Sequence, residues 1–409
     1  MPKLLSGLAS LGINVLLMRY LTTEEFGRWS LCAAAILACD AIVGSALDLT
    51  VLKEAPAWDR DDRARSIAFQ QSALLVKIVG GLGLLALLVV AASPLSRLLF
   101  RSTEHAPLVP LAGAVALGML MLRTAQIHVQ IRGNLKVFGA LDLAHFLMRM
   151  GGVGLLIALG QVSTGAVLVS FLFAPLLAFA CWASTAGREV VQNVRVDRPM
   201  MRLLFANLGW YLLTFGLSGA ISRMDVFVLS QWTDLREVGI YSAGATLAII
   251  PQILGSYLSV LFSPKITPLL NEGRFFNYFR RVQGGILALT ALSYLVFRLT
   301  WPPAATYLLP ASFVRSGDIV QALIPGALAG MATLPLTLSF ILFVRPRFFF
   351  ALDCVAVPFL LAGYYFGLKT SGVVGAAWVT TGVNLSRALI AQVLAWKWAR
   401  ESDLSRNRL

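Results

Sequence analysis

The chain has 409 residues, of which 58% are hydrophobic and only 13% are charged. Soluble domains contain about 45–50% apolar and about 25% charged residues, so this sequence has too few polar side chains to cover a water-facing surface. The composition excludes a soluble globular enzyme, a secreted disulfide scaffold and a disordered chain, and indicates a protein surrounded by lipid.

The net charge is +14, from 34 Lys and Arg residues against 20 Asp and Glu residues. Most of the excess lies in short segments between apolar runs, where cations set the membrane orientation and meet anionic lipid. No basic stripe with interleaved aromatic residues lies outside these segments, so nucleic acid is not an expected partner.

The reactive residue types form no recognisable centre. All four cysteines fall inside apolar runs without a CxxC pair, so we expect them to be buried as small hydrophobic residues. The three histidines, His105, His128 and His145, are scattered and without evident partners, so no metal site and no cofactor are expected. Neither GxxxxGK[ST] nor GxSxG occurs, which argues against ATP-driven transport within this chain.

Apolar stretches of about 18 residues or more predict about twelve transmembrane helices in an all-α, polytopic membrane protein. In chain order they cover residues 4–21, 29–52, 67–92, 107–129, 137–159, 163–185, 203–229, 238–262, 282–299, 319–344, 348–368 and 373–396. No small-x-small cleavage site precedes Thr22, so the first stretch is predicted to be a retained helix. No loop is long enough for a soluble domain, and any chemistry must take place within or between helices.

The distribution of cations predicts the orientation. With the N-terminus in the cytoplasm, 21 of the 34 Lys and Arg residues fall on the cytoplasmic side, 8 on the opposite side and 5 inside spans. This bias places both termini in the cytoplasm. Two aromatic and basic stretches, residues 274–281 and 396–398, are typical of anchors at the membrane interface.

An internal repeat relates the two halves of the chain. At an offset of 212, residues 25–30 (EFGRWS) fall on 237–242 (EVGIYS), and at 211, residues 138–142 fall on 349–353. Further matches at 212 are Lys53 with Lys265, Pro56 with Pro268, and Gln71 with Gln283. Several matches in the same order at nearly one offset indicate a duplication.

The duplication predicts the architecture. Each half carries six helices, in two lobes at residues 1–200 and 201–409. An even number of helices leaves both halves in the same orientation, so their pseudo-twofold axis runs along the membrane normal. Two such lobes around a central cavity are typical of alternating access.

The same segments carry a family resemblance. Residues 19–30 resemble the first external loop of bacterial polysaccharide-biosynthesis membrane proteins of the O-antigen flippase type, and residues 223–225 with 237–243 resemble the stretch that opens their second lobe. Residues 133–136, before the fifth span, also fit. The resemblance extends over the twelve-span pattern and places the chain in a superfamily with multidrug and peptidoglycan-precursor exporters. It implies a flippase that moves an undecaprenyl-diphosphate-linked oligosaccharide from the inner to the outer leaflet.

Cations inside the predicted spans are candidate substrate contacts, because a charge at mid-bilayer costs at least about 2.5–3.5 kcal/mol. The five are Lys77, Arg123, Arg149, Arg223 and Arg387. Three of them, Lys77, Arg149 and Arg387, lie roughly 15 Å from a span end at 1.5 Å per residue. A hydrated cationic cavity suits a lipid diphosphate, since Arg and Lys both bind phosphate oxygens. The alternative is an ion pair between helices.

Asp142, His145 and Arg149 share one helical face, which is suited to a proton relay or a phosphate clamp. The alternative for Asp142 is a hydrogen bond in helix packing, which its repeat counterpart Asp353 supports.

Three further acids fall within spans. Asp40 and Asp48 lie eight residues apart in the second span, and with Asp225 they are candidates to bind a coupling proton or sodium ion. Pairing with the intramembrane cations is the alternative.

We therefore expect a non-enzymatic flippase for a polyprenyl-diphosphate-linked oligosaccharide in surface polysaccharide biosynthesis. Its partners would be this glycolipid, membrane lipid, and the polymerase and glycosyltransferases of the same pathway. A cation-coupled multidrug exporter of the same fold is the first alternative, although it favours acidic and aromatic residues over cations in its cavity. A membrane-embedded glycosyltransferase or polymerase is the second, although the large external loop that would carry its acids is missing.

Overall fold

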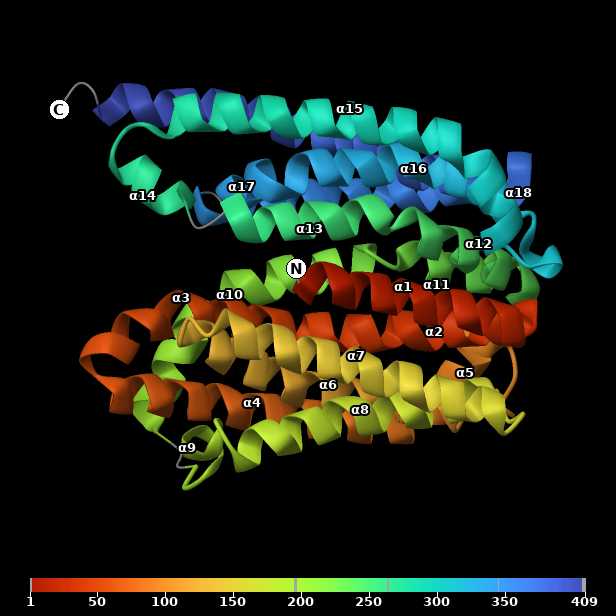
Figure 1. Cartoon of the computed structure of the whole chain (residues 1–409), viewed down its shortest axis with the longest axis horizontal. Helices are drawn as coiled ribbons and strands as arrows, with labels where there is room; N and C mark the ends of the chain where they lie inside the picture. Colours follow the sequence, from red (N-terminus) through yellow and green to blue (C-terminus); the bar gives the residue numbers. More distant parts are fainter. Residues whose placement is uncertain (1, 195–196, 263–264, 345, 407–409) are drawn as a thin grey trace. The chain divides into compact units, whose positions relative to one another are not determined.

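The computed structural model describes residues 2–194, 197–262, 265–344 and 346–406, and all regular elements in these ranges are helices (Figure 1). The chain divides into two compact units, Met1–Gly239 (unit 1) and Ile240–Leu409 (unit 2). The lobe boundary at residue 200, which the repeat indicates, remains a prediction.

Thirteen elements begin in unit 1, and the last of them, α12, continues into unit 2. They are α1 (Pro2–Tyr20), α2 (Thr23–Asp40), the π-helix η1 (Ala41–Ser45), α3 (Ala46–Asp61), α4 (Arg63–Val90), α5 (Ala92–Phe100), α6 (Leu108–Ile131), α7 (Leu135–Ala158), α8 (Thr164–Ser184), α9 (Arg188–Val191), α10 (Arg198–Ile221), α11 (Met224–Trp232) and α12 (Leu235–Ala248).

The remaining elements belong to unit 2. They are α13 (Ile250–Phe262), α14 (Ile266–Asn271), α15 (Phe275–Leu308), the 3-10 helix η3 (Ala311–Phe313), α16 (Ser316–Thr333), the π-helix η4 (Leu334–Leu338), α17 (Ser339–Val344) and α18 (Pro346–Arg406).

The helices confirm the predicted polytopic, all-α fold. In the described residues, 8 helices are long and apolar enough to cross a membrane, or 10 if each of two bent pairs is counted as one span. The backbone of α18 leaves the helical region at Ser371 and Gly372, so this element consists of two arms. Counting both arms, and adding the 19-residue α1, gives an element for every predicted span.

One predicted span is not a continuous helix. The apolar stretch at 203–229 is interrupted where α10 ends at Ile221 and α11 begins at Met224. Arg223 lies in this break, so its assignment to the interior of a helix is wrong. A hydropathy window averages over the short polar interruption, Ser222 and Arg223, and therefore misses the helix end.

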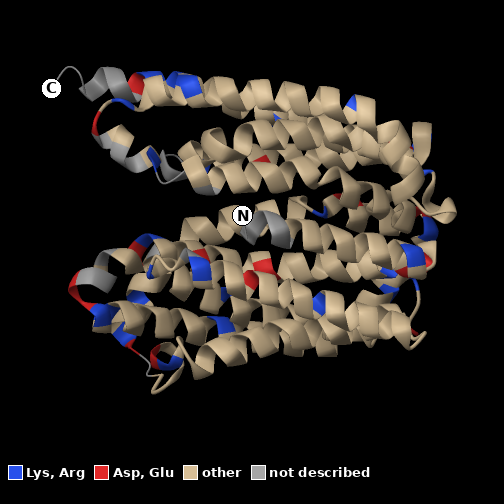
Figure 2. Ribbon diagram, viewed as in Figure 1, with Lys and Arg blue, Asp and Glu red and all other residues tan. Residues whose placement is uncertain are grey.

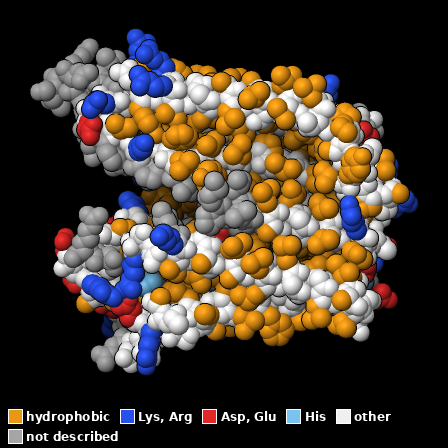
Figure 3. Space-filling view, viewed as in Figure 1, with side chains coloured by type: hydrophobic (Ala, Val, Ile, Leu, Met, Phe, Trp, Pro, Cys, Tyr) orange, Lys and Arg blue, Asp and Glu red, His pale blue; other side chains and the backbone are white. Residues whose placement is uncertain are grey.

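The expectation for the cysteines is also partly wrong. Cys32 and Cys39 are buried, but Cys181 in α8 and Cys354 in α18 are exposed on the helix flanks. Lipid-facing positions are as apolar as the core, so hydropathy alone does not separate the two. On the face seen in Figure 3, hydrophobic side chains cover the flanks and charged ones gather at the helix ends.

Side-chain caps define several helix starts. In each, the capping oxygen accepts a hydrogen bond from the backbone N–H three residues further on, which satisfies a group with no partner inside the helix. The caps are Thr22 for α2, Asp62 for α4, Asn134 for α7, Ser163 for α8 and Asp197 for α10. Four of the five lie in segments between predicted spans and Ser163 is the first residue of one, so sequences at the span ends determine where these helices begin.

Each unit is organised around one central helix. In unit 1, α6 packs against α2, α4 and α8, and in unit 2, α16 packs against α13, α15 and α18. Among the described membrane-length helices, the most apolar stretches of these two are the most buried, with 61% of residues buried in α6 and 72% in the span that α16 begins. At an offset of 212, α6 falls on α16, so the central helices occupy equivalent places in the two repeats.

Two glycines of the repeated motif meet inside unit 1. A Cβ atom on Gly27 of α2 would lie 2.1 Å from the carbonyl oxygen of Leu235, and one on Gly239 of α12 would lie 1.9 Å from that of Thr23. Residues 23 and 27 fall on 235 and 239 at the repeat offset, so the contact is symmetric. Backbone touches backbone here, as in the small-residue contacts of other membrane helices.

Gly27→Ala and Gly239→Ala should each destabilise the protein, because the obstructing atom is a backbone carbonyl that cannot rotate away. Overpacking of this kind costs typically about 1–3 kcal/mol, so the thermal unfolding midpoint of the purified protein should fall. Gly83→Ala in α4 is the matched control, because no atom lies within 4 Å of its added Cβ. Unchanged midpoints in both test variants would contradict the close packing of α2 on α12.

Candidate functional site

Four charged side chains from four helices meet inside unit 1. We call Asp40 (α2), Asp48 (α3), Lys77 (α4) and Arg123 (α6) the charge cluster. All four were candidate site residues from the sequence, two as substrate contacts and two as coupling acids. The structure joins these two groups at one place.

Ion pairs and one hydroxyl hold the charge cluster together. Lys77 Nζ donates a hydrogen bond to Asp48 Oδ1 and a second, of 3.1 Å, to Thr124 Oγ1. Arg123 Nη2 lies 3.0 Å from Asp40 Oδ2, and Arg123 Nη1 lies 4.0 Å from Asp48 Oδ2. Two cations balance two carboxylates, which reduces the cost of placing all four inside a membrane protein.

Members of the charge cluster differ in their access to the outside. The side chains of Lys77, Asp40 and Asp48 are 3%, 7% and 8% exposed, whereas that of Arg123 is 39% exposed. Arg123 is thus the most exposed member of the cluster. In the described residues, Asp40 Oδ1 and Asp48 Oδ2 accept no hydrogen bond, so each has capacity for a proton or a cation.

The π-helix η1 brings the two acids together. In a regular α-helix of 3.6 residues per turn, positions eight apart differ by about 80° around the axis. A π-turn needs an extra residue to complete a turn, which reduces this angle between Asp40 and Asp48. Gly44 lies within η1, where a Cβ atom would come 3.0 Å from Asp40 Oδ1 and 2.6 Å from a methyl carbon of Leu120.

Arg149 in α7 is a buried cation of a different kind. Its Nη2 donates to Met119 Sδ at 3.0 Å, and its guanidinium carbon lies 4.2 Å from the centre of the Phe171 ring. Its Nε has no hydrogen-bond partner, and no carboxylate pairs with Arg149 among the described residues. Sulfur and ring contacts stabilise a cation only modestly, so an anion from outside the protein would complete its electrostatic environment.

The other two residues on this face of α7 do not form a chain with Arg149. Asp142 accepts a hydrogen bond of 3.1 Å from Gln126 Nε2 on α6, as expected for a helix-packing role. His145 is buried with its ring edge-on to Phe146, and neither of its nitrogens is hydrogen-bonded in the described part of the chain. Among the described residues, therefore, no hydrogen-bonded relay runs from Asp142 to Arg149.

The fourth candidate cation within a helix, Arg387, belongs to unit 2. Arg387 pairs with Asp353 across the two arms of α18, and the Asp353 side chain is completely buried while that of Arg387 is 22% exposed. A hydrogen bond between Tyr364 Oη and Thr380 Oγ1, of 3.0 Å, joins the same arms. The Arg387–Asp353 pair closes the helical hairpin. Arg387 therefore matches the alternative to substrate contact, an ion pair between helical segments.

The last two candidates lie at the break between α10 and α11. Arg223 precedes the first residue of α11 and is half-buried. Asp225 is buried in the first turn, where its Oδ1 accepts a hydrogen bond of 2.8 Å from the Val226 N–H. A carboxylate in the first turn of a helix is stabilised by the helix dipole.

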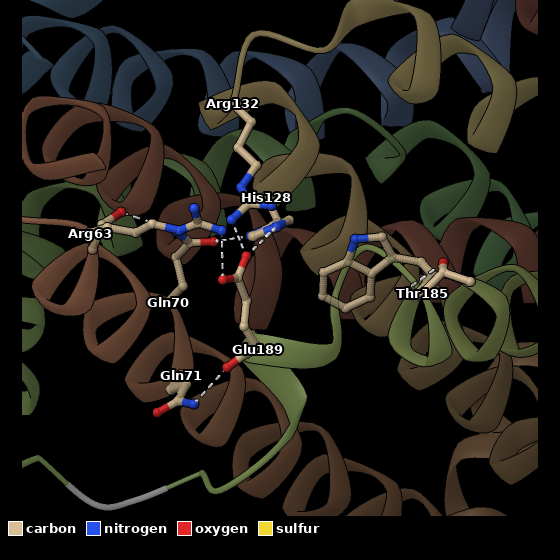
Figure 4. A network of polar contacts seen from close by, with 9 residues as sticks. Arg63, Gln70, Gln71, His128, Arg132, Thr185 and Glu189 are labelled. Atoms are coloured by element: carbon tan, nitrogen blue, oxygen red, sulfur yellow. Dashed lines mark hydrogen bonds and ion pairs between the residues drawn. The ribbon is translucent and has the colours of Figure 1, made fainter. Parts of the chain in front are cut away.

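Sequence reasoning missed a second polar network, at one end of unit 1 (Figure 4). Glu189 of α9 accepts hydrogen bonds from Arg63 at 2.8 Å and from Arg132, and its Oε1 lies 3.8 Å from His128 Nε2. We call Glu189 and these three residues the Glu189 network. It connects α9 to α4 and α6.

Two glutamines of α4 extend the Glu189 network. Gln71 Nε2 donates to the carbonyl oxygens of Glu189 and Gln192, each at 3.1 Å, and Gln70 Oε1 lies 2.8 Å from His128 Nδ1. The expectation that His128 lacks partners is therefore wrong. The repeat match at Gln71 was the only sequence signal that pointed to this network. Glu189 itself gave no signal, because a single acid in a basic loop does not reveal which residues approach it.

Several solved structures share this fold over nearly the whole chain. The Vibrio cholerae MATE transporter VcmN, in a mutant form, is 14% identical and aligns over 98% of this chain and 95% of its own, with a TM-score of 0.74. The lipid II flippase MurJ in an inward closed conformation is 12% identical over 98% and 90%, with a TM-score of 0.76. A MOP-superfamily transporter from Pyrococcus furiosus is 11% identical over 99% and 96%, with a TM-score of 0.58.

At these identities the likeness establishes the fold alone. This chain is a multi-pass membrane protein with the fold of the MOP-superfamily transporters. The sequence model described as polysaccharide biosynthesis protein matches residues 1–266, so the chain belongs to this family, which confirms the resemblance seen in the sequence. No functionally curated protein matches it significantly.

Proposed function

We propose that this protein is a flippase that moves a polyprenyl-diphosphate-linked oligosaccharide across the bacterial inner membrane by alternating access. The family and the transporter fold support translocation rather than catalysis. The observation that carries the choice of substrate is Arg149, a buried cation with no carboxylate partner among the described residues. An anionic group supplied by the substrate fits this arrangement.

The diphosphate is the natural counterpart of Arg149. It is the part that every polyprenyl-diphosphate glycan has in common, and it carries negative charge that cannot cross hydrocarbon without compensation. A guanidinium offers a planar fork of donors to phosphate oxygens. In this proposal Arg123, with its exposed side chain, makes a further contact, and Arg223 contributes positive potential. Lys77 and Arg387 are neutralised by Asp48 and Asp353 and hold the helices together.

The paired acids support a second candidate, a cation-coupled exporter. Asp40 and Asp48 each have an oxygen that accepts no hydrogen bond in the described residues, and each could exchange Arg123 for a proton or sodium ion. In the flippase proposal the same exchange supplies the coupling, with Asp142, His145 and Asp225 as further proton or ion candidates. The two functions therefore differ in the cargo rather than in this site.

Reconstitution distinguishes the two cargoes. Purified protein in liposomes should move a fluorescent polyprenyl-diphosphate oligosaccharide between leaflets, as measured by protection from a membrane-impermeant quencher. The same lipid with a monophosphate should move much more slowly, because half of the anionic group is missing. Cationic dye transport without glycolipid transport would support the exporter instead.

The proposal also requires a defined orientation, with both termini cytoplasmic. Reporter fusions after Arg65, Arg198 and Arg281 should report the cytoplasm, and fusions after Arg101 and Arg315 should report the periplasm. Both the charge bias and the six-helix repeat require this pattern. Reversed results at two of these sites would contradict the topology.

A further inference from the structure

Unit 2 contains a cavity that the transport proposal does not use. It lies where α15 begins and α18 ends, has a volume of about 760 Å³, and falls in the range of small-molecule pockets. The residues that line it are Phe276, Arg280, Trp396, Lys397, Arg400 and Glu401. We call this cavity the α15–α18 pocket.

The charge of the α15–α18 pocket is positive. Arg280, Lys397 and Arg400 face one carboxylate, Glu401, and all four side chains are exposed. Within the described part of the chain, no ion pair joins Glu401 to any of the three cations. The cations are therefore available to an external anion, and basic residues concentrate at this end of the two helices (Figure 2).

One wall of the pocket is aromatic and fixed in place. The Phe276 and Trp396 rings meet edge to face with centroids 5.8 Å apart, and Trp396 makes a second such contact with Phe279 at 5.5 Å. Phe279 is completely buried in the core of unit 2, where Phe340 packs nearby. The apolar wall is thus held by the core, beside cations that face outward.

This combination defines the chemistry of the ligand. Aromatic residues next to Lys and Arg at the end of membrane helices are typical of the headgroup level of a bilayer. A soluble anion would contact the cations but not the aromatic wall. We propose that the α15–α18 pocket binds the headgroup of an anionic phospholipid, with its phosphate at the cations and its glycerol and upper acyl carbons against Phe276 and Trp396.

Native mass spectrometry of the full-length protein tests this proposal with phosphatidylglycerol and phosphatidylcholine as probes. The wild type should retain one phosphatidylglycerol molecule more tightly than phosphatidylcholine. Removing two cations in Arg280→Gln/Arg400→Gln should weaken phosphatidylglycerol binding about thirtyfold, since each cation near an anionic surface contributes on the order of 1 kcal/mol. Arg280→Lys/Arg400→Lys should retain most of the binding.

The chain offers a matched control for this loss of charge. Arg198 and Arg202 line a cavity of about 630 Å³ in unit 1 with Pro199, Leu203 and Ala206, and that cavity has no aromatic wall. Arg198→Gln/Arg202→Gln should therefore leave the retained phosphatidylglycerol unchanged. Equal weakening in both double variants would show a general surface effect and overturn the proposal.

Two competitors separate a lipid from other anions. Glycerol 3-phosphate, which has the phosphate without acyl chains, should not displace phosphatidylglycerol at millimolar concentration; displacement would make the pocket a small-anion site. Polyprenyl diphosphate should not displace it at equal concentration either; displacement would make the pocket part of the substrate pathway. Thermal unfolding midpoints near the wild-type value would show that the variants are folded. If the Gln double variant does not fold, the Arg280→Lys/Arg400→Lys variant still tests the site, because it should retain most of the phosphatidylglycerol binding.

Discussion

Arg149→Ala should abolish surface glycan export while the protein remains folded at its normal level. We expect the protein to stay folded because, in the described structure, no acid depends on Arg149 for neutralisation. Its removal leaves Met119 and Phe171 without a cation but creates no unpaired buried charge. The binding of the substrate diphosphate, in contrast, loses both its charge and its bidentate donor. Quantitative glycan labelling at the cell surface, normalised to membrane protein level, measures the effect.

Three further variants of this helix separate charge, shape and pairing. Arg149→Lys should retain part of the export, since the charge survives while the fork does not, whereas Arg149→Met, which preserves much of the apolar packing, should be as inactive as Arg149→Ala. Adding Asp142→Asn to Arg149→Ala should not restore export, because Asp142 bonds to Gln126 rather than to Arg149. Recovery in that double variant would make Arg149 a structural partner and remove it from the substrate site.

Lys77→Met should have the opposite signature, a protein that is unstable rather than folded and inactive. Lys77 and Asp48 form a buried pair, and removing the cation leaves Asp48 with Arg123 Nη1 at 4.0 Å as its nearest compensation. Breaking a buried ion pair from one side costs about 3–5 kcal/mol. The membrane level and the thermal unfolding midpoint should both fall sharply.

The double variant Lys77→Met/Asp48→Asn should recover most of this stability, because the uncompensated carboxylate disappears with its partner. The comparison is a double-mutant cycle, in which the coupling between the two changes measures the pair itself. A double variant no more stable than Lys77→Met would show that the loss arises from packing rather than from charge.

The helices were predictable because their signals are local. Apolar runs of the right length predicted every span, and capping residues such as Asn134 and Ser163 mark the starts of helices in the sequence itself. The break at Arg223 was not predictable from the sequence, since a short interruption barely changes the mean hydropathy of a long window. The repeat pairs α6 with α16, but only the packing shows that these are the central helices of their units.

The site was predictable in composition but not in pairing. Energetic cost alone marks a cation such as Lys77 inside an apolar run, yet its partner Asp48 lies 29 residues away on another helix. The π-turn that brings Asp40 close to Asp48 has no comparable sequence signature. Whether a buried arginine has an acid beside it, which separates Arg387 from Arg149, depends on tertiary contacts alone.

The contacts around the Glu189 network also fix the positions of Gln192 and of the start of α10. Gln71 of α4 holds the carbonyl of Gln192, and α10 starts at the Asp197 cap and packs against α3. Five residue steps separate these two points, and an extended chain covers at most about 17 Å in that distance. Gln192 and the start of α10, which flank the junction between the two sequence repeats, are therefore both fixed to unit 1, through α4 and α3 respectively. This arrangement keeps α10, the first helix of the second repeat, within reach of the first, and it explains why the packing of unit 1 extends beyond residue 200.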